Sequence, residues 1–177
     1  MSLFRPQTGG DVPLDDEDLA GIGLAVVYES GAKLMTGCAL RALAALDFEQ
    51  WKKTERYQFS QLIEKLEPNV EELADTELKA SFKKLREALA IGHELRHIVV
   101  HVTWGHSEDG FAGYDYGRSR KVSGDDIRDA VQQMAEIKQA SHRFAMRVAE
   151  LVAQGVIEER EPGPGVSVLT EFGSARL

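Results

Sequence analysis

The sequence predicts a mainly α fold, an up-and-down helical bundle with a small β-hairpin inserted before the last helix. Apolar residues recur at spacings of three and four over most of the chain, which is the period of an amphipathic helix. One segment, 105–124, loses this period and alternates aromatic residues with glycines, which is typical of a hairpin. The chain has 177 residues, of which 43% are hydrophobic and 28% charged, so we expect one domain with a core of its own.

The first helix is predicted over residues 15–45, after a flexible arm over 1–14. Acidic residues at its start suit a helix N-terminus. Its glycines weaken a helix by up to about 1 kcal/mol each relative to alanine, unless small residues are needed for close helix contacts. We expect such contacts at Gly21, Gly23, Gly31 and Gly37. A shorter helix, in one piece or two, is predicted over 48–66, where Trp51, Tyr57 and Phe59 supply apolar bulk before Pro68 breaks the pattern.

The third helix, over 76–104, has the most regular apolar stripe of the sequence: Leu78, Phe82, Leu85, Leu89, Leu95, Val99 and Val102. After the hairpin, Ser123 is a plausible N-cap for a last helix over 125–153, and Gly155 is its expected stop. Residues 15–154 therefore form the predicted helical domain. Residues 155–177 form a C-terminal tail, for which a short strand is the alternative.

Composition narrows the setting and the partners. The single cysteine, Cys38, excludes an intrachain disulfide, and the chain opens without a signal-peptide pattern, so we expect a reducing cytoplasm. No apolar run reaches the ~18 residues that span a bilayer, so no membrane partner is expected. The net charge of −8 repels polyanions, so RNA would need a local basic patch. The candidates are Arg118, Arg120 and Lys121, with a solvated loop as the alternative.

The stretch "GHELRHIVVHVTWGH", Gly92–His106, holds four of the chain's five histidines and matches two motifs. The first is HExxH, in which His93 and His97 bind zinc and Glu94 is the general base. A third ligand is missing, because His101 lies about 12 Å from His93 along a straight helix and zinc bonds are ~2.1 Å. We therefore expect no metal or other cofactor, and a zinc hydrolase remains the minor alternative.

The second motif is RxxxxH, from Arg96 to His101. On a helical wheel, the residues that fall roughly 100° to 240° from Leu95 form a face that is mixed in character. This motif face consists of His93, Arg96, His97, Val100, His101 and Trp104. It is too apolar for a purely solvated surface and too polar for a core, so we predict that it is buried in a homodimer.

The sequence around this motif, "LREALAIGHELRHIVVHVTW", resembles the motif helix of small bacterial HEPN-like proteins. In that helix an arginine precedes a "VH" pair and then a tryptophan, and Arg96, Val100, His101 and Trp104 match the pattern in place. The resemblance covers roughly residues 15–154, although only the motif helix carries specific identities. His97 stands where the family most often has asparagine.

The resemblance implies a dimeric protein of toxin or defence type that cleaves RNA without a metal, with an antitoxin or another protein as partner. His101 would then act on the ribose 2′-OH, and Arg96 would clamp the phosphate. His97 or His93 of either subunit would supply the second proton transfer. RNA would contact Arg118, Arg120 and Lys121 first. The alternative is a catalytically silent dimeric interaction or regulatory module, because fold does not imply function.

Overall fold

The computed structural model describes residues 16–101, 103–107, 110–115, 120–122 and 124–158, and their side chains over 16–91 and 124–158. In chain order the elements are α1 (Asp16–Leu43), α2 (Phe48–Thr54), α3 (Phe59–Glu72), α4 (Thr76–His101), β1 (Thr103–Ser107), β2 (Gly110–Asp115), β3 (Arg120–Val122) and α5 (Gly124–Ala153). The prediction of a mainly α fold is confirmed. The long helices predicted over 15–45, 76–104 and 125–153 correspond to α1, α4 and α5.

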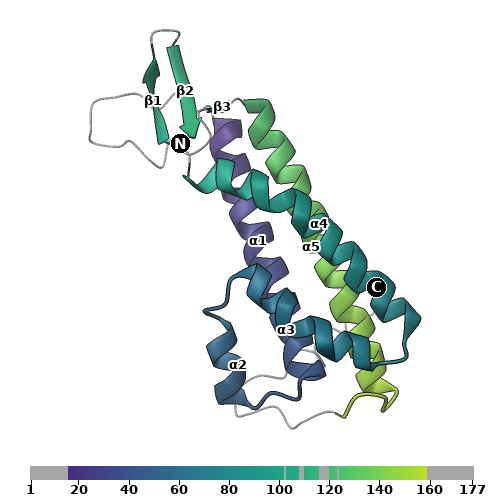
Figure 1. Cartoon of the computed structure of the whole chain (residues 1–177). Helices are drawn as coiled ribbons and strands as arrows, with labels where there is room; N and C mark the ends of the chain where they lie inside the picture. The colour runs from purple at the N-terminus through teal and green to yellow at the C-terminus, as the bar shows by residue number, and fades with distance from the viewer. Residues whose placement is uncertain (1–15, 102, 108–109, 116–119, 123, 159–177) are drawn as a thin grey trace.

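The rest of the fold prediction needs correction in two respects. The bundle is not simply up-and-down, because α1 and α5 are packed neighbours that run in the same direction, while α4 runs opposite to both (Figure 1). The expected single hairpin is also wrong, since the backbone between α4 and α5 forms a three-stranded antiparallel sheet in the order β1-β2-β3. Residues 16–91 and 124–158, where side chains are described, contain no strand, so the described core is made by the helices together with Ile157, which follows α5.

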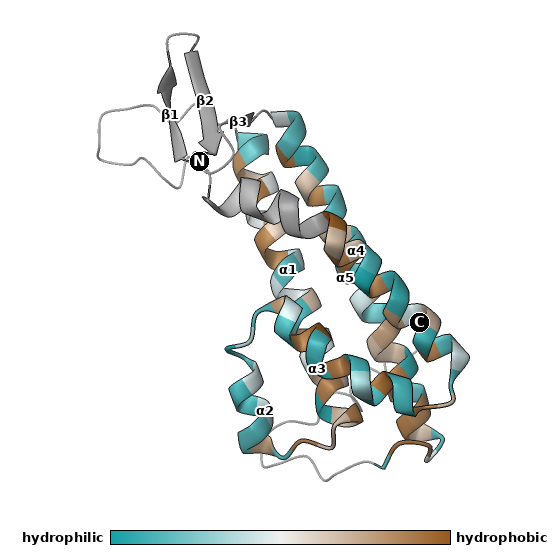
Figure 2. Cartoon of the chain, viewed as in Figure 1, coloured by the Kyte–Doolittle hydropathy of each residue, from teal (hydrophilic) through white to brown (hydrophobic). Residues whose placement is uncertain are grey.

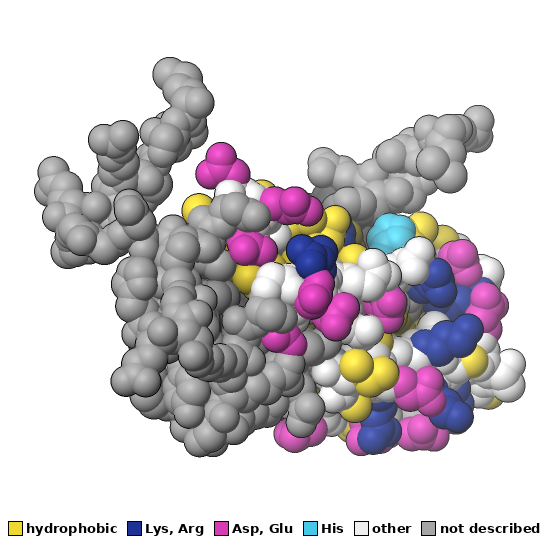
Figure 3. All heavy atoms as spheres, turned by 90° about the horizontal axis from the view of Figure 1, so that it is seen from above, with side chains coloured by type: hydrophobic (Ala, Val, Ile, Leu, Met, Phe, Trp, Pro, Cys, Tyr) yellow, Lys and Arg dark blue, Asp and Glu magenta, His cyan; other side chains and the backbone are white. Residues whose placement is uncertain are grey.

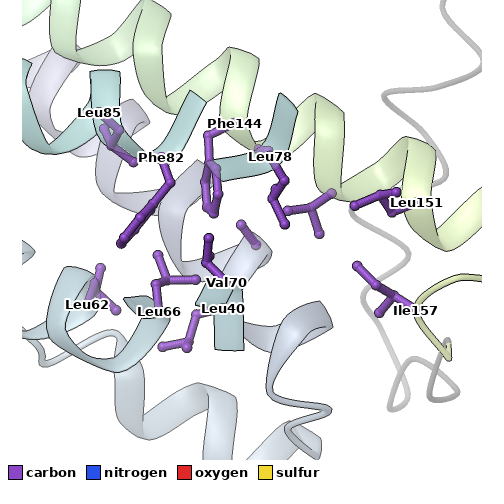
Figure 4. Packing of buried hydrophobic residues seen from close by; sticks show 13 residues of the cluster. Leu40, Leu62, Leu66, Val70, Leu78, Phe82, Leu85, Phe144, Leu151 and Ile157 are labelled. Carbon is purple, nitrogen blue, oxygen red and sulfur yellow. The ribbon is translucent and has the colours of Figure 1, made fainter. Parts of the chain in front are cut away.

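The larger part of the core lies where α3, α4, α5 and the C-terminal half of α1 meet (Figure 4). The rings of Phe82 and Phe144 pack at its centre with 5.4 Å between their centroids. Large aliphatic side chains surround them, among them Leu40, Leu62, Leu66, Val70, Leu78, Leu85, Val148 and Leu151. This cluster joins all four helices, so it is the main source of hydrophobic stabilisation in the described residues.

A second, alanine-rich cluster lies between the N-terminal halves of α1 and α5, and its buried members are Ala25, Ala32, Ala130, Met134 and Ile137. Small side chains let the two helices approach closely. A Cβ atom at Gly21 would lie 3.1 Å from Cγ2 of Ile127, so the predicted close contact is confirmed there. At Gly23 a Cβ atom would meet nothing within 4 Å, so the same explanation is wrong at that position within the single chain.

The shorter helices α2 and α3 lie beside the C-terminal half of α1 and leave its N-terminal half open on one side (Figure 1). Thr36, Gly37, Cys38, Ala39 and Leu40 are consequently buried. The α2 helix begins with a capping box, in which the Gln50 N–H donates to the Asp47 side chain at 2.8 Å and the Asp47 N–H donates back to Gln50 at 3.0 Å. None of the helices described is long and apolar enough to cross a membrane.

Candidate functional site

The predicted catalytic residues lie on the last turns of α4, which ends at His101. The backbone is helical from Arg96 through His101, so the two motif residues stand about 7.5 Å apart along the helix axis. The side chains of His93, Arg96, His97, Val100 and His101 lie outside the residues whose side chains the structure describes. Their catalytic and interface roles therefore stay predictions.

Trp104 does not belong to this helix, and its predicted place on the motif face is wrong. The residue lies in β1, where it pairs with Gly113 of β2. The sequence offers a physical reason, because His101 is followed by Val102, Thr103 and Trp104, and β-branched and aromatic residues favour strands. A face that combines Trp104 with His93 and Arg96 at helical spacing is therefore not formed.

The predicted substrate-binding residues lie partly in the sheet. Arg120 and Lys121 belong to β3, whereas Arg118 lies outside the described residues. In the register of the sheet, Lys121 pairs with Tyr114, which pairs in turn with Thr103. This row of three residues crosses the sheet over about 10 Å and ends two residues after His101. The backbone thus brings Lys121 to the same end of the molecule as His101.

The described helix ends beside the sheet are strongly acidic (Figure 3). The first turn of α1 carries Asp16, Glu17 and Asp18, and the first turn of α5 carries Asp125 and Asp126. Arg128 donates to Asp125, and this bond, together with the charges of Asp125, Glu17 and Asp18, raises the pKa of its guanidinium. A polyanion that approaches this end meets a negative field, so RNA contacts would have to come from the sheet or from the end of α4.

A groove of about 460 Å³ runs between α4 and α5, with Glu77, Ser81, Lys84, His142, Arg143 and Arg147 among its lining residues. Arg147 is held in place by Asp75 at 2.5 Å and Glu150 at 2.8 Å. Asp75 also accepts the Leu78 N–H at 2.6 Å, at the start of α4. This arginine therefore links α5 to the first turn of α4, which is a structural role.

The described residues also contain an apolar surface that the sequence analysis did not identify. Leu19, Val26, Val27 and Leu34 of α1 have exposed fractions of 49%, 45%, 61% and 49%. On a helical wheel these four residues fall within about 100° of one another, and the centre of this arc lies about 160° from the buried Ala25 and Ala32. We call these four residues the α1 stripe. Figure 2 shows apolar residues on the N-terminal half of α1, which α2 and α3 do not cover.

One sequence signal could have revealed the stripe. The apolar residues of the first half of α1 occur on all sides of the helix, and such a helix has to be covered on more than one face. In the described structure α5 and α4 cover one face only. The opposite face therefore presents apolar side chains to solvent or to a partner.

The described residues contain no group of three His, Cys, Asp or Glu side chains that could hold a metal ion. The zinc alternative concerns His93 and His97, whose side chains lie outside that set. In comparisons with known proteins, no family model, no curated protein and no solved structure matches the chain.

Proposed function

We propose that this protein is a helical interaction module that works as a homodimer through α1. The resemblance to HEPN-like proteins also implies a dimer, but the interface predicted from the sequence is the motif face and not α1. The observation that carries the proposal is the α1 stripe, four large apolar side chains aligned on the outer face of α1. Scattered apolar residues are normal on a protein surface, but a contiguous row of them on a helix is typical of an interface. None of the described elements lies over this face, which leaves it available to a second copy of the chain.

The test is the oligomeric state of the full chain, followed by sedimentation across protein concentrations. Wild type should dimerise at micromolar concentrations. Val27→Glu should raise the dimer Kd by about 100-fold, because each of two valines loses about 1.5 kcal/mol of burial. Leu24→Glu is the matched control, since Leu24 is also exposed, at 40%, but lies about 110° from the centre of the stripe. Monomeric wild type at 100-fold higher concentration contradicts the proposal.

A second candidate function is metal-independent cleavage of RNA. One backbone observation favours it, the row from Lys121 through Tyr114 to Thr103, which places a basic residue about 10 Å across the sheet from the residue two positions after His101. In this mechanism His101 takes the proton of a ribose 2′-OH, whose oxygen attacks the adjacent phosphorus. The 5′ oxygen leaves with a proton from His97 or His93, and Arg96 stabilises the charge on the phosphate. The products are a 2′,3′-cyclic phosphate and a free 5′-OH.

His101→Ala should abolish this cleavage and Arg96→Ala should nearly do so, both in the presence of EDTA, while deoxyribose at the cleavage site should block the reaction. His142→Ala is the control, because His142 is an exposed histidine of α5 that borders the groove between α4 and α5. Product analysis on single-stranded RNA measures each outcome. Cleavage that persists in the His101→Ala protein contradicts the mechanism, and a wild type without cleavage leaves the interaction module as the function.

A further inference from the structure

We infer that two copies of the chain pair through α1 in antiparallel orientation, with the two-fold axis passing between Val26 and Val27. This inference rests on the proposed homodimer and specifies which surface forms it and in which register. It comes from three properties of the described part of α1. These are the spacing of its apolar residues, the distribution of its charges, and the small residues Gly23 and Ser30 along the middle of the stripe.

The spacing of the α1 stripe is symmetric about the point between Val26 and Val27. In an antiparallel pair centred there, Val26 of one copy lies opposite Val27 of the other, and Leu19 lies opposite Leu34. All four side chains of the α1 stripe thus meet an apolar side chain of the other copy. A two-fold interface requires such self-complementarity, because the same patch is used by both subunits.

The charges of α1 favour the same orientation. Its first turn is acidic, with Asp16, Glu17 and Asp18, whereas its basic residues, Lys33 and Arg41, lie in its second half. Antiparallel pairing places Lys33 of one copy within about one turn of Asp16 and Glu17 of the other. The Lys33 ammonium already donates one hydrogen bond to the Glu55 carbonyl oxygen of its own chain, at 3.1 Å, and keeps two further N–H groups for such a contact. Parallel pairing would put the acidic turns side by side. The two helix dipoles are also opposed in the antiparallel pair, which stabilises it further.

Small residues lie along the middle of the stripe, where two helices would come closest. Gly23 and Ser30 are both exposed and fall within about 10° of the centre of the arc. In the antiparallel register Gly23 of one copy lies opposite Ser30 of the other. A Cβ atom at Gly23 would meet nothing within 4 Å in the single chain, so no other part of the described chain occupies this surface. The pair of small residues lets the two backbones approach closely, as at other tight helix contacts.

The polar and charged groups near these positions do not oppose the contact. The Ser30 hydroxyl can donate to the carbonyl oxygen four residues earlier in its own helix, that of Val26, so the hydroxyl can be buried with a partner. Glu29 is the other acidic residue of α1 beyond its first turn. It lies about 110° from the centre of the stripe, so its carboxylate stays outside the interface.

The contact is limited at one end by the fold. Beyond Leu34 the side chains from Thr36 to Leu40 are buried, so the second half of α1 is not available to another copy. The pairing region from Leu19 to Leu34 is about 22 Å long. Most of it lies on the N-terminal half of α1, which α2 and α3 leave open (Figure 1).

Disulfide formation between engineered cysteines in the full chain tests the register. Leu19→Cys and Leu34→Cys replace exposed residues, so both variants should fold. When the two variants are mixed and mildly oxidised, a covalent dimer should form at least tenfold faster than with either variant alone. In the antiparallel pair, position 19 of one copy would lie about 22 Å from position 19 of the other, well beyond the ~7 Å between Cα atoms that a disulfide allows.

Two controls accompany the mixture. Wild-type protein has only Cys38, which is buried and whose thiol pKa is raised by that burial, so it should form no cross-link. Adding Val27→Glu to both variants should suppress the cross-link, because the dimer itself is weakened.

The outcomes separate the inference from the proposed function when sedimentation is run on the same reduced samples. A dimer that forms no mixed cross-link overturns the register and keeps the homodimer. Rapid cross-linking of Leu19→Cys alone shows a parallel pair and also overturns the register. A monomer in every sample overturns the proposed function, and the inference with it.

Discussion

Arg147 is the side chain that fixes the start of α4 against α5. It contacts Asp75 through two nitrogen atoms, Nε at 3.2 Å and Nη2 at 2.5 Å, and both side chains are only about one fifth exposed. The hydrogen bond from Arg147 holds the pKa of the Asp75 carboxyl below its usual range, and the Leu78 N–H lowers this pKa further. A carboxyl group whose pKa is lower in the folded than in the unfolded chain stabilises the folded chain when it is ionised.

The consequence is a pH dependence of stability that Asp75→Asn should remove. The contribution of Asp75 is complete above its unfolded pKa, about 3.9, and is lost as the pH falls through its lower folded pKa. Asparagine can still cap the N-terminus of α4, so the variant removes the negative charge of residue 75 and keeps its capping hydrogen bond. Thermal melts should show a lower Tm than wild type at pH 7 and a shrinking difference below about pH 4. Glu87→Gln, which removes an exposed pair with Lys83, should show little of either effect.

Single-residue predictions were accurate where burial follows from side-chain type. Cys38 and Trp51 are both buried, as side chains of these types commonly are. Arg147 escaped notice because its partner is 72 residues away in sequence, and no local pattern joins the two. The same limit applies to the motif residues Arg96 and His101, because the roles proposed for them involve a second chain as well as this one.

Among the elements, α3 departs most clearly from its predicted length. The sequence predicts that Pro68 ends the helix, yet α3 continues to Glu72. The proline is exposed, so the carbonyl of Glu64, which loses its helical donor, can bond water. Two residues later Val70 is fully buried in the larger core cluster. The burial of Val70 offsets the cost of the proline, and tertiary packing thus overrides the local signal.

Pro68→Ala should therefore stabilise the protein. An interior proline costs roughly 3 kcal/mol in a helix, and its restriction of the unfolded chain returns about 0.4–1 kcal/mol. A net gain of about 2 kcal/mol corresponds to a Tm rise of roughly 4–8 °C for a chain of this size. Glu64→Ala, an exposed position on the same helix, should change stability by less than about 0.5 kcal/mol. An unchanged or lower Tm for Pro68→Ala would contradict this prediction. It would show that α3 gains no stability from a backbone hydrogen bond between residue 68 and the Glu64 carbonyl.

The apolar stripe of α4 shows why the end of that helix was misjudged. Leu78, Phe82 and Leu85 are buried in the larger cluster, as predicted. From Leu89 to Leu95, however, the chain advances six residues, which is about 240° around a helix. The apolar sequence therefore changes face before the motif, and it cannot be treated as one continuous stripe up to Trp104.

At the scale of the whole molecule, the core differs between its two ends. The cluster around Phe144 contains large side chains from four helices, whereas the cluster around Ala25 and Ala130 is made mainly of small ones between α1 and α5. Buried apolar area scales with side-chain size, so the second cluster stabilises its end less. Local opening should begin there.

Hydrogen exchange of backbone amides should show this difference. In a monomeric Val27→Glu protein, amides of α1 near Ala25 and Ala32 should exchange faster than those near Leu40, and dimerisation of wild type should slow the former selectively. Exchange measured by mass spectrometry on the two proteins at one concentration compares them directly. Equal protection along α1 in both proteins would show that the small-residue end is as stable as the rest.

Which half of α1 is enclosed could not be predicted from its own sequence. Both halves are rich in apolar residues, and the difference comes from α2 and α3, which are only long enough to cover the half that contains Cys38 and Leu40. The number and type of helices follow from local periodicity. Which face of each helix is covered depends on how the helices pack together in the folded chain.

The α1 stripe and the alanine-rich cluster lie on opposite faces of α1. Substitutions on one face should therefore affect folding, and those on the other should affect only the outer surface. Changes at Ala25 or Ala32 affect whether the chain folds, because those side chains fill the contact with α5. Changes at Val26 or Leu34, one or two positions away along the same helix, leave that contact intact and alter only the outer surface. The outer surface of α1 can therefore change during evolution, or be redesigned, with little penalty in folding. A single helix thus carries one face that builds the scaffold and another that can vary independently.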